Sequence, residues 1–219
     1  HRPRTVRLLK EYGDTKISDV TIAQAIGGAR GVRCLVTDVS YLDPFEGIRF
    51  RGRTIPETFA ALPPVEGQEY PSVEGFFYYL MTSEIPTAEQ AAEVVADFTT
   101  RRQLPDYVKD ILRAMPKDTH PMTMYSAGIL AMQRESIFVK KYNEGMSKMD
   151  YWDPMFEDSC NLMAKLPVLA AFIYRLKYKD DDQIAEDPNL DMGGNFAHQM
   201  GIDAPYDDVA RMYFILHSD

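Results

Sequence analysis

Apolar residues recur at helical spacing along most of this chain. Between positions 55 and 217, side chains three and four positions apart are apolar, and capping or turn residues separate the stretches. Ser72 is placed to cap one helix, and Thr87 with Gln90 forms a capping box for the next. We expect a basic arm or helix over 1–16 and helices over 55–62, 73–82, 87–103, 105–115, 122–133, 135–146, 151–178, 189–199 and 204–217. The pattern predicts a mainly helical fold of roughly ten helices.

One stretch has a period of two instead. Residues 36–41 are β-branched and aromatic, and residues 48–51 alternate between apolar and charged side chains. Asp43-Pro44 between them is a turn signal, because proline fixes φ and aspartate bonds its own backbone. We therefore expect one small β-hairpin. Arg49 and Arg51 lie on one of its faces, where they either bind a carboxylate or phosphate or are solvated surface side chains.

The longest expected helix contains a proline. Pro167 lies inside 151–178, where proline removes a backbone donor and clashes with the preceding turn. We expect a kink or a break near Lys165 and Leu166.

Composition narrows the classes of partner. The chain has 219 residues, of which 45% are hydrophobic and 26% charged, and its net charge is −9. These are ordinary globular values, and the negative charge argues against binding nucleic acid or an anionic membrane surface. An anionic ligand would need a local basic cluster. No apolar run is long enough to span a membrane, so we expect no membrane insertion.

The cysteines and the first residues say little about function. Cys34 and Cys160 are far apart and have no zinc-ligand spacing, so we expect buried free thiols in a reducing compartment. The first ten residues are basic and lack acids, which fits a processed N-terminus or an exposed amphipathic helix.

No complete catalytic set is recognisable from the residues alone. The histidines are His1, His120, His198 and His217, and none has metal-ligand spacing with another. His120 precedes a proline at a helix start, and His198 lies on a helix, so both are expected to be structural. Nucleophile, zinc-protease and phosphate-loop motifs are absent from the sequence. The glycines of residues 27–31 either let the backbone approach a ligand closely or form a turn before the hairpin.

Several long segments resemble, in the same order, the citrate synthases of the mitochondrial type. They are GGARG at 27–31, VTDVSYLDPFEGIRFRGRTIPE at 36–57, PSVEGFFYYLMTSEIPTAEQ at 71–90, HPM at 120–122, AKLPVLAAFIYR at 164–175 and LHSD at 216–219. The resemblance covers nearly the whole chain. It implies an all-α, multi-helical large domain with one small β-hairpin near the N-terminus, of which residues 1–219 are the N-terminal part.

The resemblance also implies an activity. Citrate synthases condense acetyl-CoA with oxaloacetate to citrate and CoA in the tricarboxylic acid cycle, with acetyl-CoA as a substrate and no permanently bound cofactor. The family's HEGGN, GPLHG and PGYGH motifs, which carry its catalytic residues, do not occur here. We therefore expect the catalytic residues to come from sequence or from a companion chain not present here, and the 219 residues alone to be inactive. The implied location is the mitochondrial matrix.

Two cations are candidate contacts to the phosphates of CoA. By resemblance, Arg30 of the GGARG segment contacts a CoA phosphate. Lys148, shortly before a Tyr-Trp pair, occupies a position where the family carries arginine. Lysine keeps the charge and loses the planar fork, so its binding of a phosphate is less directional. The alternative for each is an ordinary surface cation.

The resemblance further implies a second citrate synthase subunit. Residues 125–132 and 168–173 correspond to helices of the family's dimer interface, and their small side chains permit close helix packing. The alternative is that they are plain core. Two other functions stay open, namely half of a methylcitrate synthase and a non-catalytic structural subunit of a mitochondrial assembly.

Overall fold

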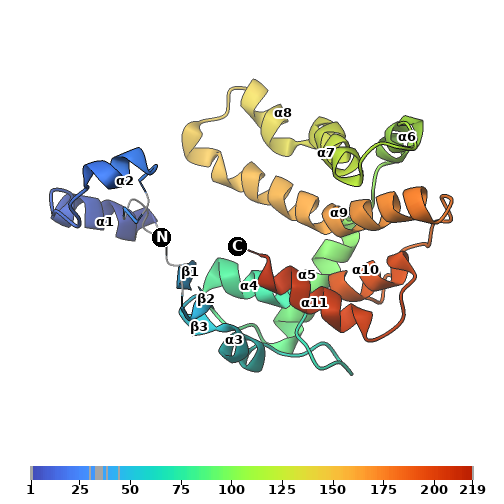
Figure 1. The fold of residues 1–219 in the computed structure, drawn as a ribbon, viewed down its shortest axis with the longest axis horizontal. Coiled ribbons are helices and arrows are strands. Elements are labelled where there is room, and N and C mark those ends of the chain that lie inside the picture. The colour runs from blue at the N-terminus through green and yellow to red at the C-terminus, as the bar shows by residue number, and fades with distance from the viewer. Residues whose placement is uncertain (1, 30, 33–36, 38, 44, 219) are drawn as a thin grey trace. The chain divides into compact units, whose positions relative to one another are not determined.

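The computed structural model describes residues 2–29, 31–32, 37, 39–43 and 45–218. The chain divides into two compact units, residues 1–38 and 39–219, which are treated separately below. The described residues form eleven α-helices, two short 3-10 helices and one three-stranded sheet (Figure 1). The prediction of a mainly helical fold with a small β element is confirmed.

The bounds of the elements follow the expected pattern closely. The first unit contains α1 (Arg2–Tyr12) and α2 (Ile22–Ile26). The second unit contains, in chain order, β1 (Ser40–Asp43), β2 (Gly47–Phe50), β3 (Arg53–Thr54), α3 (Ile55–Ala61), α4 (Val73–Thr82), α5 (Ala88–Arg101), α6 (Asp106–Ala114), α7 (Pro121–Met132), η1 (Gln133–Glu135), α8 (Ile137–Asn143), η2 (Lys148–Asp150), α9 (Trp152–Tyr178), α10 (Met192–Met200) and α11 (Tyr206–Leu216).

Local side-chain caps explain where several helices begin. The Thr87 hydroxyl accepts from Gln90 N at 3.2 Å, and Gln90 Oε1 accepts from Thr87 N at 2.9 Å. Ser72 Oγ accepts from Gly75 N at 3.0 Å at the start of α4. Both predicted caps are therefore confirmed, and each satisfies backbone donors that have no partner within the helix.

The sheet contains the predicted hairpin and one strand more. β1 pairs with β2 and β2 with β3, both antiparallel, and Tyr41 lies opposite Arg49. Asp43 Oδ1 accepts from the backbone N–H groups of Phe45 at 2.8 Å and Glu46 at 2.9 Å, which closes the turn. The third strand was not predicted, because a two-residue strand is too short to show a period.

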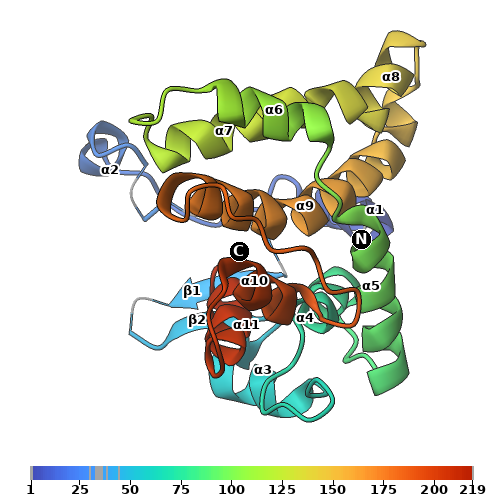
Figure 2. The ribbon, with the colours of Figure 1, turned by 90° about the vertical axis from the view of Figure 1, so that its right-hand side faces the viewer.

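Helix α9 runs through the middle of the second unit. In both views it lies between α6, α7 and α8 on one side and α4, α5, α10 and α11 on the other (Figures 1 and 2). The core between α6, α7 and α9 is built of buried Leu104, Val108, Leu112, Met124, Met132, Val168, Leu169, Phe172 and Ile173. Residues 168–173 are thus largely core of this chain. None of the helices in the described residues is both long and apolar enough to cross a bilayer.

The second core lies between the sheet, α3, α4 and α11. Phe50 and Phe76 meet edge to face with ring centroids 4.9 Å apart. Tyr79 is buried beside them, and its hydroxyl donates to Phe50 O at 2.9 Å. This bond ties α4 to the end of β2 and satisfies a polar group that would otherwise be buried alone.

Of the kink or break expected near Lys165 and Leu166, the break is wrong, because α9 is continuous from Trp152 to Tyr178. The kink stays a prediction. A proline inside a helix costs about 3 kcal/mol. Burial of the neighbouring Ala164, Val168 and Leu169 offsets this cost, since α9 packs against helices on both of its sides. Tertiary packing here outweighs the local preference.

Two expected helices begin later or end earlier than predicted. Of the stretch 135–146 only Ile137–Asn143 is α-helical, because η1 ends at Glu135 and the Ser136 hydroxyl caps α8 by accepting from Val139 N at 3.0 Å. The stretch 189–199 becomes helical only at Met192, after the cap residue Asp191.

Cys160 is a buried free thiol, as predicted, and burial raises its pKa. Cys34 lies outside the described residues.

Candidate functional site

Of the two predicted CoA contacts, Arg30 and Lys148, only Lys148 lies among the residues that the structure describes. Arg30 lies outside the described residues, so its role stays a prediction. Lys148 is the first residue of η2 and is exposed to solvent. Ser147 Oγ accepts from Met149 N at 3.2 Å and fixes the start of this short helix.

Lysines, carboxylates and aromatic residues all lie near Lys148 in the sequence, between positions 140 and 153. Nearby Lys141 Nζ pairs with Asp153 at 3.1 Å, whereas Lys148 has no acidic partner among the described residues. The Trp152 side chain at the start of α9 is 70% exposed. Behind it, the Tyr151 ring packs edge to face on Phe138 with centroids 5.2 Å apart. The Tyr151–Phe138 contact packs the start of α9 against α8, and Lys148 and the Trp152 ring are both exposed to solvent.

The two hairpin arginines both make hydrogen bonds to groups of this chain. Arg49 Nη2 pairs with Glu46 at 2.7 Å, and its Nη1 donates to Gly52 O at 3.2 Å. Arg51 Nε donates to Leu80 O at 3.0 Å, at the end of α4, and Arg51 Nη2 donates to the same oxygen. Both guanidinium groups bond within the chain, and these bonds give no support to a paired carboxylate or phosphate site.

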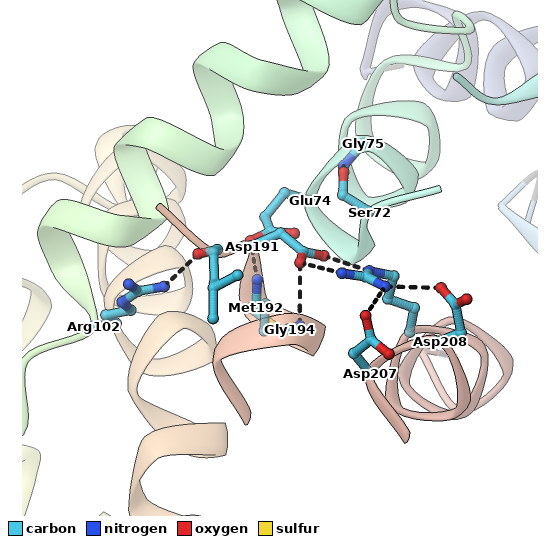
Figure 3. Close-up of polar contacts among 11 residues, drawn as sticks. Ser72, Glu74, Gly75, Arg102, Asp191, Met192, Gly194, Asp207 and Asp208 are labelled. Atoms are coloured by element: carbon cyan, nitrogen blue, oxygen red, sulfur yellow. Dashed lines mark hydrogen bonds and ion pairs between the residues drawn. The ribbon is translucent and has the colours of Figure 1, made fainter. Parts of the chain in front are cut away.

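A buried cluster of charges joins α4, α5, α10 and α11 (Figure 3). Its central members are Glu74, Arg102, Asp191 and Arg211, all of which are buried. Charged side chains are rarely buried unless they are paired. The cluster therefore marks the place where the second unit is most tightly specified.

Arg211 and Asp191 form the strongest pair in this cluster. Arg211 Nη2 lies 2.8 Å from Asp191 Oδ1 and Nε lies 3.0 Å from Oδ2, so the contact is bidentate. Arg211 Nη1 also pairs with Asp207 at 3.0 Å and Asp208 at 2.8 Å. Burial opposes the charge of Arg211, but the three carboxylates outweigh burial, and its pKa is raised.

Glycine is required where α10 meets this arginine. A Cβ built on Gly193 would lie 2.5 Å from Arg211 Cγ and 3.2 Å from Arg211 N. The second of these atoms is backbone, which cannot move aside cheaply. The close approach of α10 to α11 therefore depends on Gly193.

Glu74 is held in a different way. Its Oε1 accepts from Met192 N at 2.8 Å, at the first turn of α10, while the buried Oε2 has no hydrogen-bond partner in the structure. Burial, and then the charge of Asp191, raise the pKa of Glu74 to about 7, against the smaller opposing effects of backbone bonds and Arg102. Burial and the nearby Asp191 carboxylate thus both favour the protonated form of Glu74.

Arg102 connects the end of α5 to the segment before α10. Its Nε pairs with Glu186 at 2.9 Å, Nη1 donates to Leu190 O at 2.9 Å, and Nη2 donates to Asp187 O at 2.5 Å. None of these groups is arranged for catalysis. Among the described residues, no group of His, Cys, Asp and Glu side chains could hold a metal ion.

Sequence reasoning did not single out this cluster. Asp207 and Asp208 lie four and three residues before Arg211 on the same helix. That spacing was an available signal. Glu74 and Met192 are 118 positions apart, and no local pattern reveals their contact.

The described histidines all make contacts within the chain, which fits the structural role expected of His120 and His198. His120 caps α7 with Nδ1 accepting from Met122 N at 3.2 Å. His198 Nε2 lies 3.1 Å from Ala185 O, and His217 stacks on Tyr213.

A cleft of about 550 Å³ lies between α5, α7, α8 and α9. Its walls carry Arg101 and Lys165, but Arg101 pairs with Glu157 at 2.8 Å and Lys165 with Glu135 at 2.7 Å. The cations of this cleft are neutralised by their neighbours, so it does not indicate an anion site.

Comparison with known proteins places the chain in one family. The family model described as "Citrate synthase, C-terminal domain" matches residues 28–219. The mitochondrial citrate synthase of Saccharomyces cerevisiae is 46% identical over 211 residues, which cover 96% of this chain and 44% of that protein. The peroxisomal citrate synthase of the same yeast is 44% identical over 220 residues, which cover 100% of this chain and 48% of that protein.

A solved structure supports the fold. The citrate synthase from Pyrobaculum aerophilum superposes with a TM-score of 0.72 at 20% identity, over 89% of this chain and 47% of that one. The chain thus spans about half the length of the relatives it matches. The matches along nearly all of its residues show that the chain belongs to the citrate synthase family.

Proposed function

We propose that residues 1–219 are the N-terminal part of the large domain of an enzyme that condenses acetyl-CoA with oxaloacetate to citrate and CoA. The observation that carries this proposal is 46% identity, along 96% of the chain, to a mitochondrial citrate synthase. The chain spans about half of such a relative, and it lacks the HEGGN, GPLHG and PGYGH segments. The catalytic groups then lie in sequence outside these residues or in a companion chain. The 219 residues alone do not catalyse the condensation.

Lys148 is proposed to bind a phosphate of CoA in the complete enzyme, together with Arg30. Support comes from its exposure on η2 and from the absence of an acidic partner among the described residues. In a chain with a net charge of −9, a cation that no carboxylate neutralises is a favourable place for an anionic ligand. The exposed Trp152 ring lies four positions further along the chain.

The experiment is steady-state kinetics of the complete enzyme with Lys148→Ala. We expect KM for acetyl-CoA to rise about three- to tenfold, as an exposed charge contact to phosphate supplies about 1 kcal/mol. KM for oxaloacetate stays unchanged, and Lys148→Arg retains the affinity for acetyl-CoA. Lys117→Ala, which removes an exposed lysine of a loop, is the matched control. Equal changes in both KM values would show that Lys148 is structural.

The same assay decides between the related functions. Faster turnover of propionyl-CoA than of acetyl-CoA would identify a methylcitrate synthase. No turnover in the intact native assembly, with all its chains present, would identify a non-catalytic structural subunit.

The proposed partner is a second copy of the protein, and the proposed location is the mitochondrial matrix. Support for the partner comes from α7, whose Met122 and Leu130 are exposed on the face turned away from the core. Support for the location comes from the mitochondrial relatives, although a peroxisomal relative matches nearly as well. Imaging of the tagged native protein separates these two compartments.

A further inference from the structure

At the contact between α4 and α10, one buried carboxyl oxygen has no hydrogen-bond partner. Glu74 is 1% exposed, and its Oε2 has no partner in the structure. Glu74, Thr99, Arg102, Met192 and Asn195 line a small cavity at this place. The centre of a water-sized sphere can move through about 10 Å³ of it, which is close to the least volume that holds one water molecule.

Two carboxylates share the N-terminus of α10, and they are held unequally. Asp191 Oδ1 accepts from Gly194 N at 3.1 Å, and both oxygens of Asp191 contact the guanidinium group of Arg211. Glu74 accepts from Met192 N and has no guanidinium group in direct contact among the hydrogen bonds of the described residues. Because two nearby buried carboxylates repel each other, the proton goes to the one without a direct cation, which is Glu74.

Oε2 of Glu74 needs a partner in either protonation state. An ionised oxygen accepts hydrogen bonds, and a protonated oxygen donates one. Arg102 uses three of its five N–H groups in the bonds described above, which leaves two donors on a side chain that also lines the cavity. Asn195 Nδ2 donates one of its two hydrogens to Gln199 Oε1 at 3.0 Å. A water molecule in the cavity can therefore find the two to four polar partners that buried waters have.

We propose that one water molecule fills this cavity and bridges Oε2 of Glu74 and the guanidinium group of Arg102. The water completes the hydrogen bonds of a protonated Glu74 carboxyl group. This group, the water and Arg102 form the joint between α4, α5 and α10. The joint senses pH, because loss of the proton leaves a buried charge close to that of Asp191. The other charged groups around Glu74 are Arg102 at the end of α5, Glu186 in the segment before α10 and Arg211 of α11.

The direction of the pH effect follows from the pKa of Glu74. Its value of about 7 in the folded protein lies above the ordinary value of 4.5 expected in the unfolded chain. The stability that Glu74 contributes is thus fully present below about pH 4.5 and is lost as the pH rises through about 7. A neutral side chain of the same shape removes this dependence.

The first test compares wild type with Glu74→Gln in the complete protein, by urea unfolding at pH 5 and pH 8. Glutamine can accept from Met192 N and donate to the water, but it does not ionise. We expect the folding equilibrium constant of wild type, relative to Glu74→Gln, to fall about tenfold or more between the two pH values. Glu93→Gln, on the exposed face of α5, shows no such change. If the ratio of the folding equilibrium constants of Glu74→Gln and wild type is the same at pH 5 and pH 8, the proposal is overturned.

The second test does not depend on the folding of a variant. In wild type with ¹³C-labelled glutamate side chains, one carboxyl resonance should titrate close to neutral pH, well above the other glutamates. A crystal structure should show one water within hydrogen-bond distance of Glu74 Oε2. A dry cavity, or the absence of any glutamate titrating near neutral pH, would refute the proposal.

Discussion

Gly128 of α7 lies directly against Leu169 of α9. A Cβ built on Gly128 would come within 2.8 Å of Leu169 Cδ1 and 3.1 Å of Cδ2. Leu169 is completely buried, and its side chain cannot turn away without disturbing the core between α6, α7 and α9. The separation of the two helices is therefore set by the absence of a side chain at position 128.

A larger side chain at position 128 should destabilise the protein. We expect Gly128→Val to lower the free energy of unfolding by about 2–3 kcal/mol through overpacking. Gly128→Ala should cost less, because alanine gains about 1 kcal/mol in helix propensity. Chemical unfolding measures both, with Ser126→Ala on the exposed face of α7 as the control. A Gly128→Val protein as stable as wild type would show that α7 and α9 can move apart freely.

Removal of Arg211 should be far more damaging than removal of a surface arginine. Arg211→Met leaves Asp191 buried without its cation, so we expect a loss of about 3–5 kcal/mol in the free energy of unfolding. Arg113 pairs with Asp181 at 2.7 Å, but both side chains are substantially exposed. Arg113→Met should therefore cost only about 1 kcal/mol or less. Equal losses for the two variants would contradict the assigned weight of the buried pair.

Asp158 of α9 should anchor α8 in position. Its oxygens accept from Ile137 N at 2.8 Å, from Phe138 N at 3.0 Å and from the Ser136 hydroxyl at 2.6 Å. We expect Asp158→Ala to cost about 1–2 kcal/mol, as for the loss of a helix cap. Amide exchange should accelerate first at Ile137 and Phe138. Asp118→Ala, in an exposed loop, is the control, and unchanged exchange in α8 would disprove this role.

The proposed second copy of the protein can be tested at the outer face of α7. Leu130 is 75% exposed there, although it belongs to an apolar helix. If a partner covers this face, Leu130→Glu buries a charge and should shift the complete enzyme from dimer to monomer in light scattering. Ala96→Glu on the exposed face of α5 should leave the mass unchanged. If the Leu130→Glu protein stays a dimer, the interface lies on another face.

The parts of the fold that sequence could predict are those with local causes. The capping box of Thr87 and Gln90 and the hydroxyl of Ser72 act within one helical turn, so their residues suffice to recognise them. Pro167 does not end the helix as a break would require, because packing on both sides of α9 decides the outcome there. The buried charge cluster around Glu74 was harder to predict from sequence, because the contact of Glu74 with Met192 joins positions far apart in the chain. Lys148 was proposed through resemblance and stays a prediction, since its sequence neighbours alone are those of any exposed lysine.

Helix α9 has a consequence for how the second unit comes apart. Its Val168, Leu169 and Phe172 belong to the core shared with α6 and α7, while its Cys160 and Ala164 pack with Phe98 of α5. Neither layer can melt and leave the other intact, because each would take half of the same helix with it. The two layers should unfold in a single cooperative step, with their slowest amides opening together.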